Sequence, residues 1–466
     1  MTAAALIRAG VAQPMRPWPR YLLTSEAWRA MAHALGSGPE PVFLGLWADT
    51  AHAHALFMAE APLLASVRIE AGMFGALSPA RPAAAPFERM AHDLWGHLPG
   101  NGVDPRPLLD QGRWPVLRPL SARPAPNTAS PEPAEFLGSA GHGLHQVSIG
   151  PVGGILDAVH LRVTAAGETA VRLEAGLGYA HRGILALMRG KPLHAAAALA
   201  SRIAADSTVA HAVAFARAAE AAAGVEPPPR GQALRGVMME LERIATHLSD
   251  LGAAAPGLME ARCGELREGV LRASHAAFGH RLMMDCAAPG GAAADLAPAG
   301  MAALSAILGR IAAAGPTLRR GLDGMAGRTV GVGVLEPLER SALRGRPNAA
   351  VPAMRANDVD ARLRLRLAEI HGSAALLRSV LAGLPPGPVN VAMPAAGGEG
   401  LGVADGPRGG IWHWLRLHDG VVAANFACDP AWLHLAAIEA ACHGACLDDV
   451  PLILRSLNPA IVNLEL

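Results

Sequence analysis

The stretch of sequence that decides the fold is residues 232–251, QALRGVMMELERIATHLSDL. Its apolar side chains recur at steps of three and four residues, the periodicity of an amphipathic α-helix. These side chains are Leu234, Val237, Met238, Leu241, Ile244 and Leu248. Helical patterns also cover residues 193–223, 258–283 and 360–384, the first as one alanine-rich helix or as a pair of helices. Because a one-sided apolar stripe must pack against a neighbour, these segments predict a helical bundle.

Strand-like patterns flank the predicted bundle in the sequence. Residues 147–149 and 159–163 are short apolar segments separated by turn glycines, and about the last eighty residues mix strand and helix patterns. Between residues 21 and 120, apolar runs alternate with helix-like stretches at 25–35 and 87–94, which predicts a small α+β unit.

A proline-rich segment separates the two units. Four prolines fall within residues 123–133, and proline fixes φ and removes an amide donor, so this segment is predicted to be extended. The predicted fold class is α+β. A small α+β domain covers 1–122, a linker covers 123–137, and a mainly helical domain with β elements at its ends covers 138–466.

Composition excludes several classes of function. Lys+Arg is 40 against Asp+Glu 39, so the chain lacks the basic footprint of a nucleic-acid-binding protein. The longest apolar stretch, residues 296–308, is shorter than the roughly 18–20 residues that cross a bilayer. Arg8, Arg16 and Arg20 interrupt any signal-peptide core, which predicts a cytoplasmic protein. A hydrophobic content of 51% favours a large subunit interface.

Two side-chain groups have alternative interpretations. Cys442 and Cys446, at i and i+4, would share a helix face beside His443 and could bind a metal, or they could simply pack against a neighbouring helix. The other group is Glu240, Arg243 and His247, which lie on one face of the helix at 232–251. That face could brace two helices or conduct protons.

Five motifs resemble, in the right order, the large subunit of group 4 nickel–iron hydrogenases and the related 49-kDa (D) subunit of complex I. They are 178–184 (GYAHRGI), 239–248 (MELERIATHL), 279–282 (GHRL), 400–409 (GLGVADGPRG) and 449–459 (DVPLILRSLNP). Residues 87–96 (FERMAHDLWG) resemble the 30-kDa (C) subunit of complex I. The resemblance therefore implies a fused C–D chain of the kind found in hydrogenase-4 and formate hydrogenlyase large subunits.

The family's metal ligands are missing from this chain. The resemblance places four thiolates in two motifs, and the matching positions here hold Ala204, Ser207, Ala460 and Asn463. Because hard or apolar side chains do not replace soft thiolates around a nickel–iron pair, we expect no metal centre. Complex I relatives use the same pocket for a quinone. Their tyrosine position is Ala205 here, and the hairpin 150–154 lacks their histidine.

The polar surroundings of the family pocket are retained. Asp157 and Asp405 stand where relatives carry glutamates, and Arg408 matches the arginine that lines the hydrogenase pocket. Asp206, Ser207 or a nearby histidine are candidate contacts to a quinone. The full set of candidate site residues is Asp157, His181, Arg202, Asp206, Ser207, His211, Asp405 and Arg408.

The resemblance implies a peripheral subunit on the cytoplasmic side of the inner membrane. Its expected partners are an iron–sulfur small subunit that carries a [4Fe–4S] cluster, antiporter-like membrane subunits and, if the pocket is redox-active, a quinone. Electrons would pass from the cluster to quinone or another acceptor, coupled to ion translocation. A non-catalytic scaffold is the alternative, and a working hydrogenase is a third interpretation. The resemblance also implies NAD-linked electron transfer. This chain contains no dinucleotide-binding fingerprint, however, because Gly400-x-Gly402 is too short to count as one.

Overall fold

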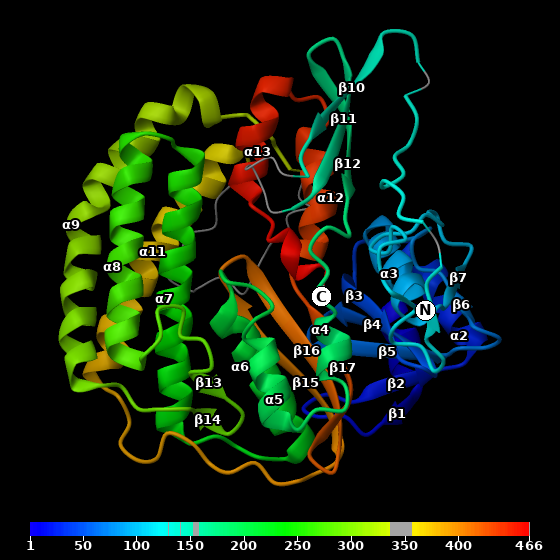
Figure 1. The fold of residues 1–466 in the computed structure, drawn as a ribbon, viewed down its shortest axis with the longest axis horizontal. Helices are drawn as coiled ribbons and strands as arrows, with labels where there is room; N and C mark the ends of the chain where they lie inside the picture. Colours follow the sequence, from blue (N-terminus) through cyan, green and yellow to red (C-terminus); the bar gives the residue numbers. More distant parts are fainter. Residues whose placement is uncertain (129, 140, 152–157, 336–356, 466) are drawn as a thin grey trace.

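The computed structural model describes residues 1–466 except 129, 140, 152–157, 336–356 and 466 (Figure 1). Its strands and helices lie in separate segments rather than in repeated βαβ units, so the fold belongs to the predicted α+β class. Asp157 and residues 152–154 of the predicted hairpin lie outside the described residues.

Residues 1–122, here called the N-terminal lobe, fold around a five-stranded sheet with the order β1-β2-β5-β4-β3. Its neighbouring strands are antiparallel except for the parallel pair β2 and β5. The strands are β1 (Val11–Gln13), β2 (Arg20–Leu23), β3 (Val42–Ala48), β4 (His52–Met58) and β5 (Pro62–Arg68). The helices are α1 (Ala3–Arg8), α2 (Ser25–Leu35) and α3 (Ala85–Trp95), preceded by a 3-10 turn at Pro82–Ala84. The helices predicted at 25–35 and 87–94 are thus confirmed.

Short strand pairs complete the first part of the chain. They are β6 (Met73–Gly75) with β7 (Leu98–Gly100), and β8 (Val116–Leu117) with β9 (Ala125–Pro126). Residues 138–466, here called the C-terminal lobe, begin with an antiparallel sheet of β10 (Leu144–Ile149), β11 (His160–Ala166) and β12 (Thr169–Gly176). The strands predicted between 147 and 163 fall in this sheet.

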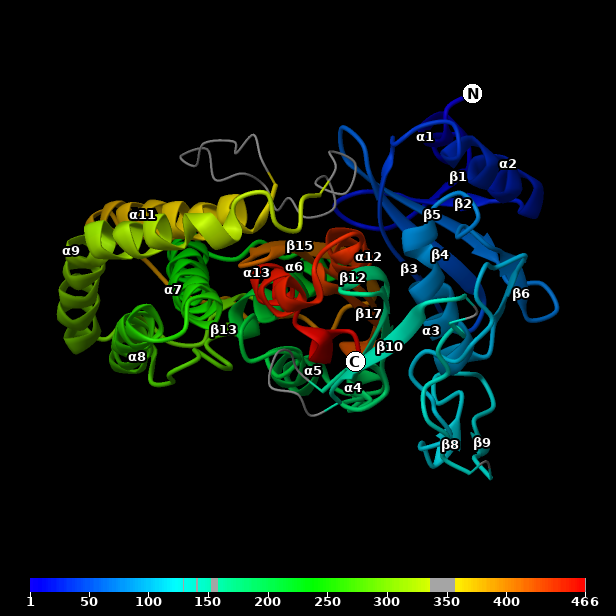
Figure 2. The same ribbon diagram turned by 90° about the horizontal axis from the view of Figure 1, so that it is seen from above.

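Long helices form a bundle at the end of the molecule away from the N-terminal lobe (Figures 1 and 2). They are α7 (Pro229–Ala254), α8 (Leu258–Phe278), α9 (Pro298–Thr329) and α11 (Val359–Ala382). Shorter helices precede them: α4 (Ile184–Met188), α5 (Leu193–Ala200) and α6 (Thr208–Ala223). A two-stranded hairpin, β13 (Ala287–Ala288) and β14 (Gly291–Ala292), follows α8. The segment interpreted as one helix or two, 193–223, is therefore a pair.

Helix α9 is the one helix among the described residues that is long and apolar enough to cross a membrane by length and composition. It contains most of the apolar stretch noted at 296–308. Its buried side chains include Leu304, Ile307, Leu308 and Ile311, and it packs against α8 and α11. The large apolar side chains of α9 are therefore buried against α8 and α11.

The last part of the chain returns to strands and short helices. An antiparallel sheet contains β15 (Gly398–Gly406), β16 (Gly409–His418) and β17 (Val421–Cys428). It is followed by α12 (Ala431–Cys442), α13 (Val450–Leu457) and 3-10 turns at Leu447–Asp449 and Ile461–Asn463. Strand β15 lies directly on α6, because a Cβ at Gly400 or Gly402 would collide with the backbone of that helix. These glycines therefore permit close packing of a strand on a helix.

The two lobes share aromatic contacts. Trp47 of β3 stacks on Phe426 of β17 with ring centroids 4.9 Å apart. Phe87 of α3 stacks on Trp432 of α12 at 4.6 Å. Apolar side chains of both lobes therefore belong to one continuous core. The predicted linker, residues 123–137, contains β9 and no helix among its described residues.

The prediction that Cys442 and Cys446 share one helix face is wrong. Helix α12 ends at Cys442, and Gly444 adopts a positive φ of 76° that breaks the helical path. Cys442 is buried and Cys446 is exposed. The two thiols therefore do not face a common neighbour, and Cys442 is a packing residue.

Candidate functional site

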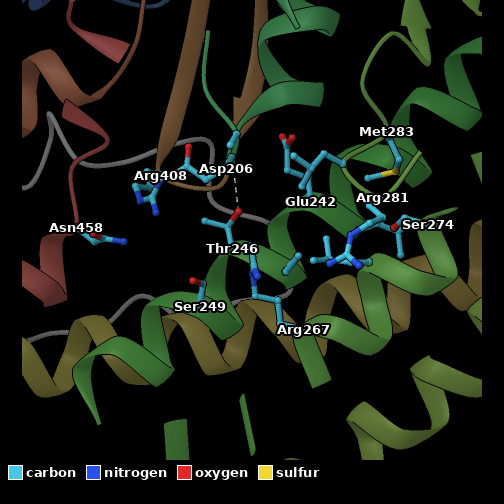
Figure 3. A pocket seen from close by; sticks show the side chains of 15 residues that line it. Asp206, Glu242, Thr246, Ser249, Arg267, Ser274, Arg281, Met283, Arg408 and Asn458 are labelled. Atoms are coloured by element: carbon cyan, nitrogen blue, oxygen red, sulfur yellow. Dashed lines mark hydrogen bonds and ion pairs between the residues drawn. The ribbon is translucent and has the colours of Figure 1, made fainter. Parts of the chain in front are cut away.

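A pocket of about 110 Å³ lies where the segment between α5 and α6 meets α7, α8 and the turn between β15 and β16. Asp206, Glu242, Thr246 and Arg408 line it, with Arg267 and Ser274 from α8 (Figure 3). Figure 3 shows Arg408 and Asn458 on one side of the pocket and Arg281, Ser274 and Met283 on the other. The pocket is therefore lined by residues from four of the five quoted motifs, namely 239–248, 279–282, 400–409 and 449–459.

Arg408 links two carboxylates at the pocket wall. Its Nη1 forms an ion pair with Asp206, and its Nη2 lies 3.0 Å from Asp250 Oδ1. Asp250 is also held by Arg366 Nε at 3.0 Å and by Asn458 Nδ2 at 2.6 Å. Burial alone would raise the pKa of Asp250, but the guanidinium groups of Arg408 and Arg366 lower it to about 2. Asp250 is therefore ionised at neutral pH.

Glu242 fixes the start of α6. Its Oε1 accepts a hydrogen bond from Val209 N at 2.6 Å, and its Oε2 accepts one from Ala210 N at 3.0 Å. These amides are among those that an α-helix leaves unsatisfied in its first turn. Burial raises the pKa of Glu242 to about 8 despite these two bonds. Thr246, one turn later on α7, donates to Asp206 O at 2.8 Å.

A buried cluster of histidines and one aspartate lies one turn into α6. His211 Nε2 donates to Asp429 Oδ2 at 3.1 Å, and its Nδ1 is hydrogen-bonded to His413 Nε2 at 3.1 Å. Burial would raise the pKa of Asp429, but the hydrogen bond from His211 lowers it. Burial lowers the pKa of His413 well below its usual value, and the nearby His211 adds to this effect. His413 is therefore neutral.

The structure brings three of the predicted site residues together. Asp206 and Arg408 line the pocket, and Ser207 Oγ donates to Asp206 Oδ1 at 3.1 Å. His211 lies in the adjacent buried cluster rather than in the pocket itself. The side chains of these four residues all lie near the start of α6.

Three predicted residues lie elsewhere. Arg202 forms a two-point ion pair with Asp285, with both N–O distances 2.6 Å. His181 stacks on Trp114 at 4.2 Å and donates from Nδ1 to Glu465 O at 2.9 Å, and burial lowers its pKa to about 4. Asp405 contributes its carbonyl oxygen to Arg243 Nη2 at 2.8 Å, and its side chain does not line the pocket.

The positions matched to the family's four thiolates are filled by a hydrogen-bonded arrangement. Asn463 Nδ2 donates to Asp429 Oδ2 at 2.9 Å, and Ala204 and Ala460 are buried methyl groups. Within the described part of the chain, no group of three or more His, Cys, Asp and Glu side chains is placed to hold a metal ion.

The sequence patterns did not single out Glu242, Thr246 and Asp250, which follow one another at steps of four on α7. All three fall within residues 232–251, so the polar side chains on this second face could have been found by the same periodicity. The face of α7 that the sequence analysis singled out, with Glu240 and His247, contacts α11. His247 Nε2 donates to Glu369 Oε2 at 2.5 Å, and Glu240 accepts from Ser373 Oγ at 2.5 Å. These contacts match the predicted brace between helices.

Comparison with known proteins finds relatives among hydrogenase subunits and NADH-quinone oxidoreductase D subunits. The chain is homologous to hydrogenase subunits and to the D subunit of NADH-quinone oxidoreductase, which confirms the resemblance carried by its motifs. Formate hydrogenlyase subunit 5 of Escherichia coli is 27% identical over 440 residues, covering 83% of this chain and 76% of the relative. The NADH-quinone oxidoreductase D subunit of Clostridium beijerinckii is 24% identical over 352 residues, covering 65% and 91%.

A solved structure shares the fold. In the membrane-bound sulfane sulfur reductase, described as an archaeal respiratory membrane complex, one chain superposes with a TM-score of 0.65 at 19% identity. The match covers 70% of this chain and 99% of that chain. No protein family model matches the sequence.

Proposed function

We propose that this chain is the large subunit of a membrane-associated complex related to hydrogenase-4 and complex I, and that its pocket works without a nickel–iron centre. The observation that carries the proposal is the ion-pair network of Asp206, Arg408 and Asp250. This network borders the pocket, whereas the positions matched to the family's thiolates hold no sulfur ligand.

The residues at those four positions do not fit a nickel–iron pair. Ala204 and Ala460 offer methyl groups, Ser207 offers a hydroxyl that donates to Asp206, and the Asn463 carboxamide donates to Asp429. None supplies a thiolate, the soft ligand that such a metal pair needs. No step of the proposed function passes through this metal.

In the proposed reaction, electrons arrive from a [4Fe–4S] cluster on a partner small subunit and leave on a quinone or another acceptor. Reduction of a quinone to a quinol by two electrons also takes up two protons. Glu242 holds a proton at neutral pH, since its pKa is about 8, and it lines the pocket. Its role would be to supply one of the two protons, with the second taken from water, while Arg408 and Asp206 position the acceptor.

The proposal includes the arrangement of the complex. The N-terminal lobe corresponds to the 30-kDa (C) subunit, residues 123–137 to a linker, and the C-terminal lobe to the 49-kDa (D) subunit. The chain would lie on the cytoplasmic side of the inner membrane against an iron–sulfur small subunit, and both would rest on antiporter-like membrane subunits. Homology to the D subunit of NADH-quinone oxidoreductase supports this arrangement.

A non-catalytic scaffold is the second candidate. The contacts of Arg202, His181 and Asp405 favour it, because each of these predicted pocket residues ties distant segments of the chain together. A scaffold would keep such contacts and lose the need for a working pocket.

Arg408→Lys separates the two candidates. Lysine keeps the charge but cannot contact both carboxylates with a planar two-point fork, so turnover with a quinone should fall by at least about tenfold while the complex still assembles. The measurement is electron transfer to a quinone analogue by the purified complex, with Arg328→Gln, an exposed substitution near the end of α9, as the control. Unchanged turnover in the lysine variant would favour the scaffold. Stoichiometric nickel in the purified complex would overturn the metal-free pocket.

A further inference from the structure

We propose that the pocket binds a small polyatomic anion, held by hydrogen-bond donors of α8 and the Arg408 side chain. The inference rests on the proposed function because it concerns the same site, and there it favours the alternative acceptor, an anion, over a neutral quinone. Its evidence is separate from homology, because it depends on which polar groups at the pocket lack partners.

Arg267 is the first of these groups. Arg267, Leu271 and Ser274 are spaced by four and three residues, so they lie on one face of α8, and all three line the pocket. Arg267 is half-buried and makes no hydrogen bond or ion pair within the described part of the chain. Its neighbour Arg281 is already paired with Glu268 at 2.8 Å. Arg267 therefore presents an uncompensated positive charge to the pocket.

Two buried polar atoms at the pocket also lack partners. Ser274 is fully buried, and its hydroxyl makes no hydrogen bond to any described residue. The Arg408 side chain is 8% exposed, and its Nε–H is likewise unpaired although both terminal nitrogens are used. An unpaired buried donor costs about 1–3 kcal/mol, so such atoms at a pocket wall indicate a ligand that accepts hydrogen bonds.

The charges around the pocket favour an anion over a neutral or cationic ligand. Asp206 and Asp250 are balanced by Arg408 and Arg366, which leaves Arg267 as the excess charge. Glu242 faces Asp206, Arg243 and two backbone amides of α6, and its raised pKa keeps it protonated at neutral pH. It therefore adds a further donor and no negative charge.

The space is adequate for such an ion. The cavity measures about 110 Å³, whereas a single water needs roughly 10–15 Å³ on the same measure. A tetrahedral or planar oxyanion could contact α8 through some of its oxygen atoms and Arg408 through others.

Sulfate is the probe, measured by equilibrium dialysis of the radiolabelled ion against the purified complex at constant ionic strength. Arg267→Gln removes the uncompensated charge and should weaken sulfate binding by about 10- to 100-fold, the usual value of a hydrogen bond to a charged group. Ser274→Ala should weaken it by a smaller factor. Arg262→Gln on the same helix, whose side chain pairs with Glu265 away from the pocket, is the matched control and should bind as the unmodified complex does.

Dimethyl sulfone, a neutral molecule of similar shape, is the second probe and should not compete with sulfate. Equal sulfate affinity in Arg267→Gln, or equal competition by dimethyl sulfone, would overturn the inference. The test is independent of turnover. Sulfate binding combined with normal turnover in Arg408→Lys would leave the anion site standing and remove the redox role. If the complex binds no sulfate but turnover is impaired in Arg408→Lys, the redox role stands and the anion site is overturned.

Discussion

Glu242 is a carboxylic acid that the folded protein keeps protonated at neutral pH. Its pKa is about 8 when folded and 4.5 in an ordinary solvated setting, because burial disfavours the charged form. Below pH 4.5 the group is protonated in both the folded and unfolded states. Between about pH 4.5 and 8 only the unfolded state loses the proton, so the free energy of unfolding decreases as the pH rises through this window.

Glu242→Gln should remove this pH dependence. The side chain can no longer ionise, so the loss of up to about 1.4 kcal/mol per pH unit between pH 4.5 and 8 should disappear. The measurement is the free energy of unfolding in urea as a function of pH. Glu226→Gln, at an exposed position, should leave the slope as it is. An unaltered slope in Glu242→Gln would show that this carboxyl is not the group responsible.

Individual site residues could be predicted where they lie in a segment that resembles the family, because the resemblance implies which side chains share the pocket. Asp206 and Ser207 follow from the matched thiolate positions and Arg408 from the motif at 400–409, and the structure places the three side chains together. Arg202 was misplaced because its partner, Asp285, comes from a loop 83 residues away, and no pattern in the sequence links the two. Arg267 was missed because a lone arginine on a helix usually faces solvent, and only the packing of α8 against α7 turns it to the pocket.

At the level of elements, the packing of β15 on α6 depends on two glycines. A Cβ at Gly402 would overlap Ala214 O and Ala218 N of the helix, and neither backbone atom can move aside. Gly402→Ala should therefore destabilise the protein by about 1–3 kcal/mol or more, because strand and helix must separate. The check is the midpoint of urea unfolding.

Gly410→Ala is the matched control, since it lies in the neighbouring strand β16 and its nearest side-chain atom, Trp412 Nε1, is 3.4 Å from the added Cβ. It should change the midpoint much less. Equal effects of the two substitutions would mean that close packing on α6 does not set the requirement for glycine at 402.

Long helices with a regular apolar stripe were predicted to within a few residues, as α7 and α11 illustrate. The sequence does not decide between one helix and two at 193–223, because an alanine-rich sequence has neither an apolar stripe nor a strong stop signal at residues 201–207. The end of α12 was missed for a related reason. Helical spacing was extended past Cys442, although Gly444 could have indicated the stop.

At the level of the whole molecule, a buried ion pair joins the lobes. Arg20 Nε lies 2.8 Å from Glu399 Oε1, with side-chain exposures of 9% and 7%. Glu399 also accepts from Trp414 Nε1 at 2.9 Å. Removing Glu399 leaves Arg20 buried without its counterion, which typically costs about 3–5 kcal/mol. Removing Arg20 leaves Glu399 with only the longer ion pair to Arg416, at 3.4 Å.

Arg20→Met and Glu399→Gln should each destabilise the protein by several kcal/mol, and the double variant by clearly less than their sum. The measurement is a double-mutant cycle on the free energy of unfolding. The surface pair of Arg230 and Asp295, at 2.9 Å, is the comparison and should show a coupling below about 1 kcal/mol. Additive effects at Arg20 and Glu399 would contradict a role in joining the lobes.

The contact between the lobes could not be predicted from the sequence, because its members lie hundreds of residues apart and carry no shared pattern. The predicted domain boundary at 123–137 stays a prediction. A proline-rich segment predicts extended backbone at those residues, but it does not indicate whether the lobes on either side pack against each other.

The aromatic stacks of Trp47 on Phe426 and of Phe87 on Trp432 have an evolutionary consequence. Because the two halves contact each other through matched rings, the surfaces that meet do not depend on the peptide that joins them. A gene encoding them could be split or joined at that point without altering how the surfaces meet, whereas drift in a ring on one half obliges a compensating change on the other.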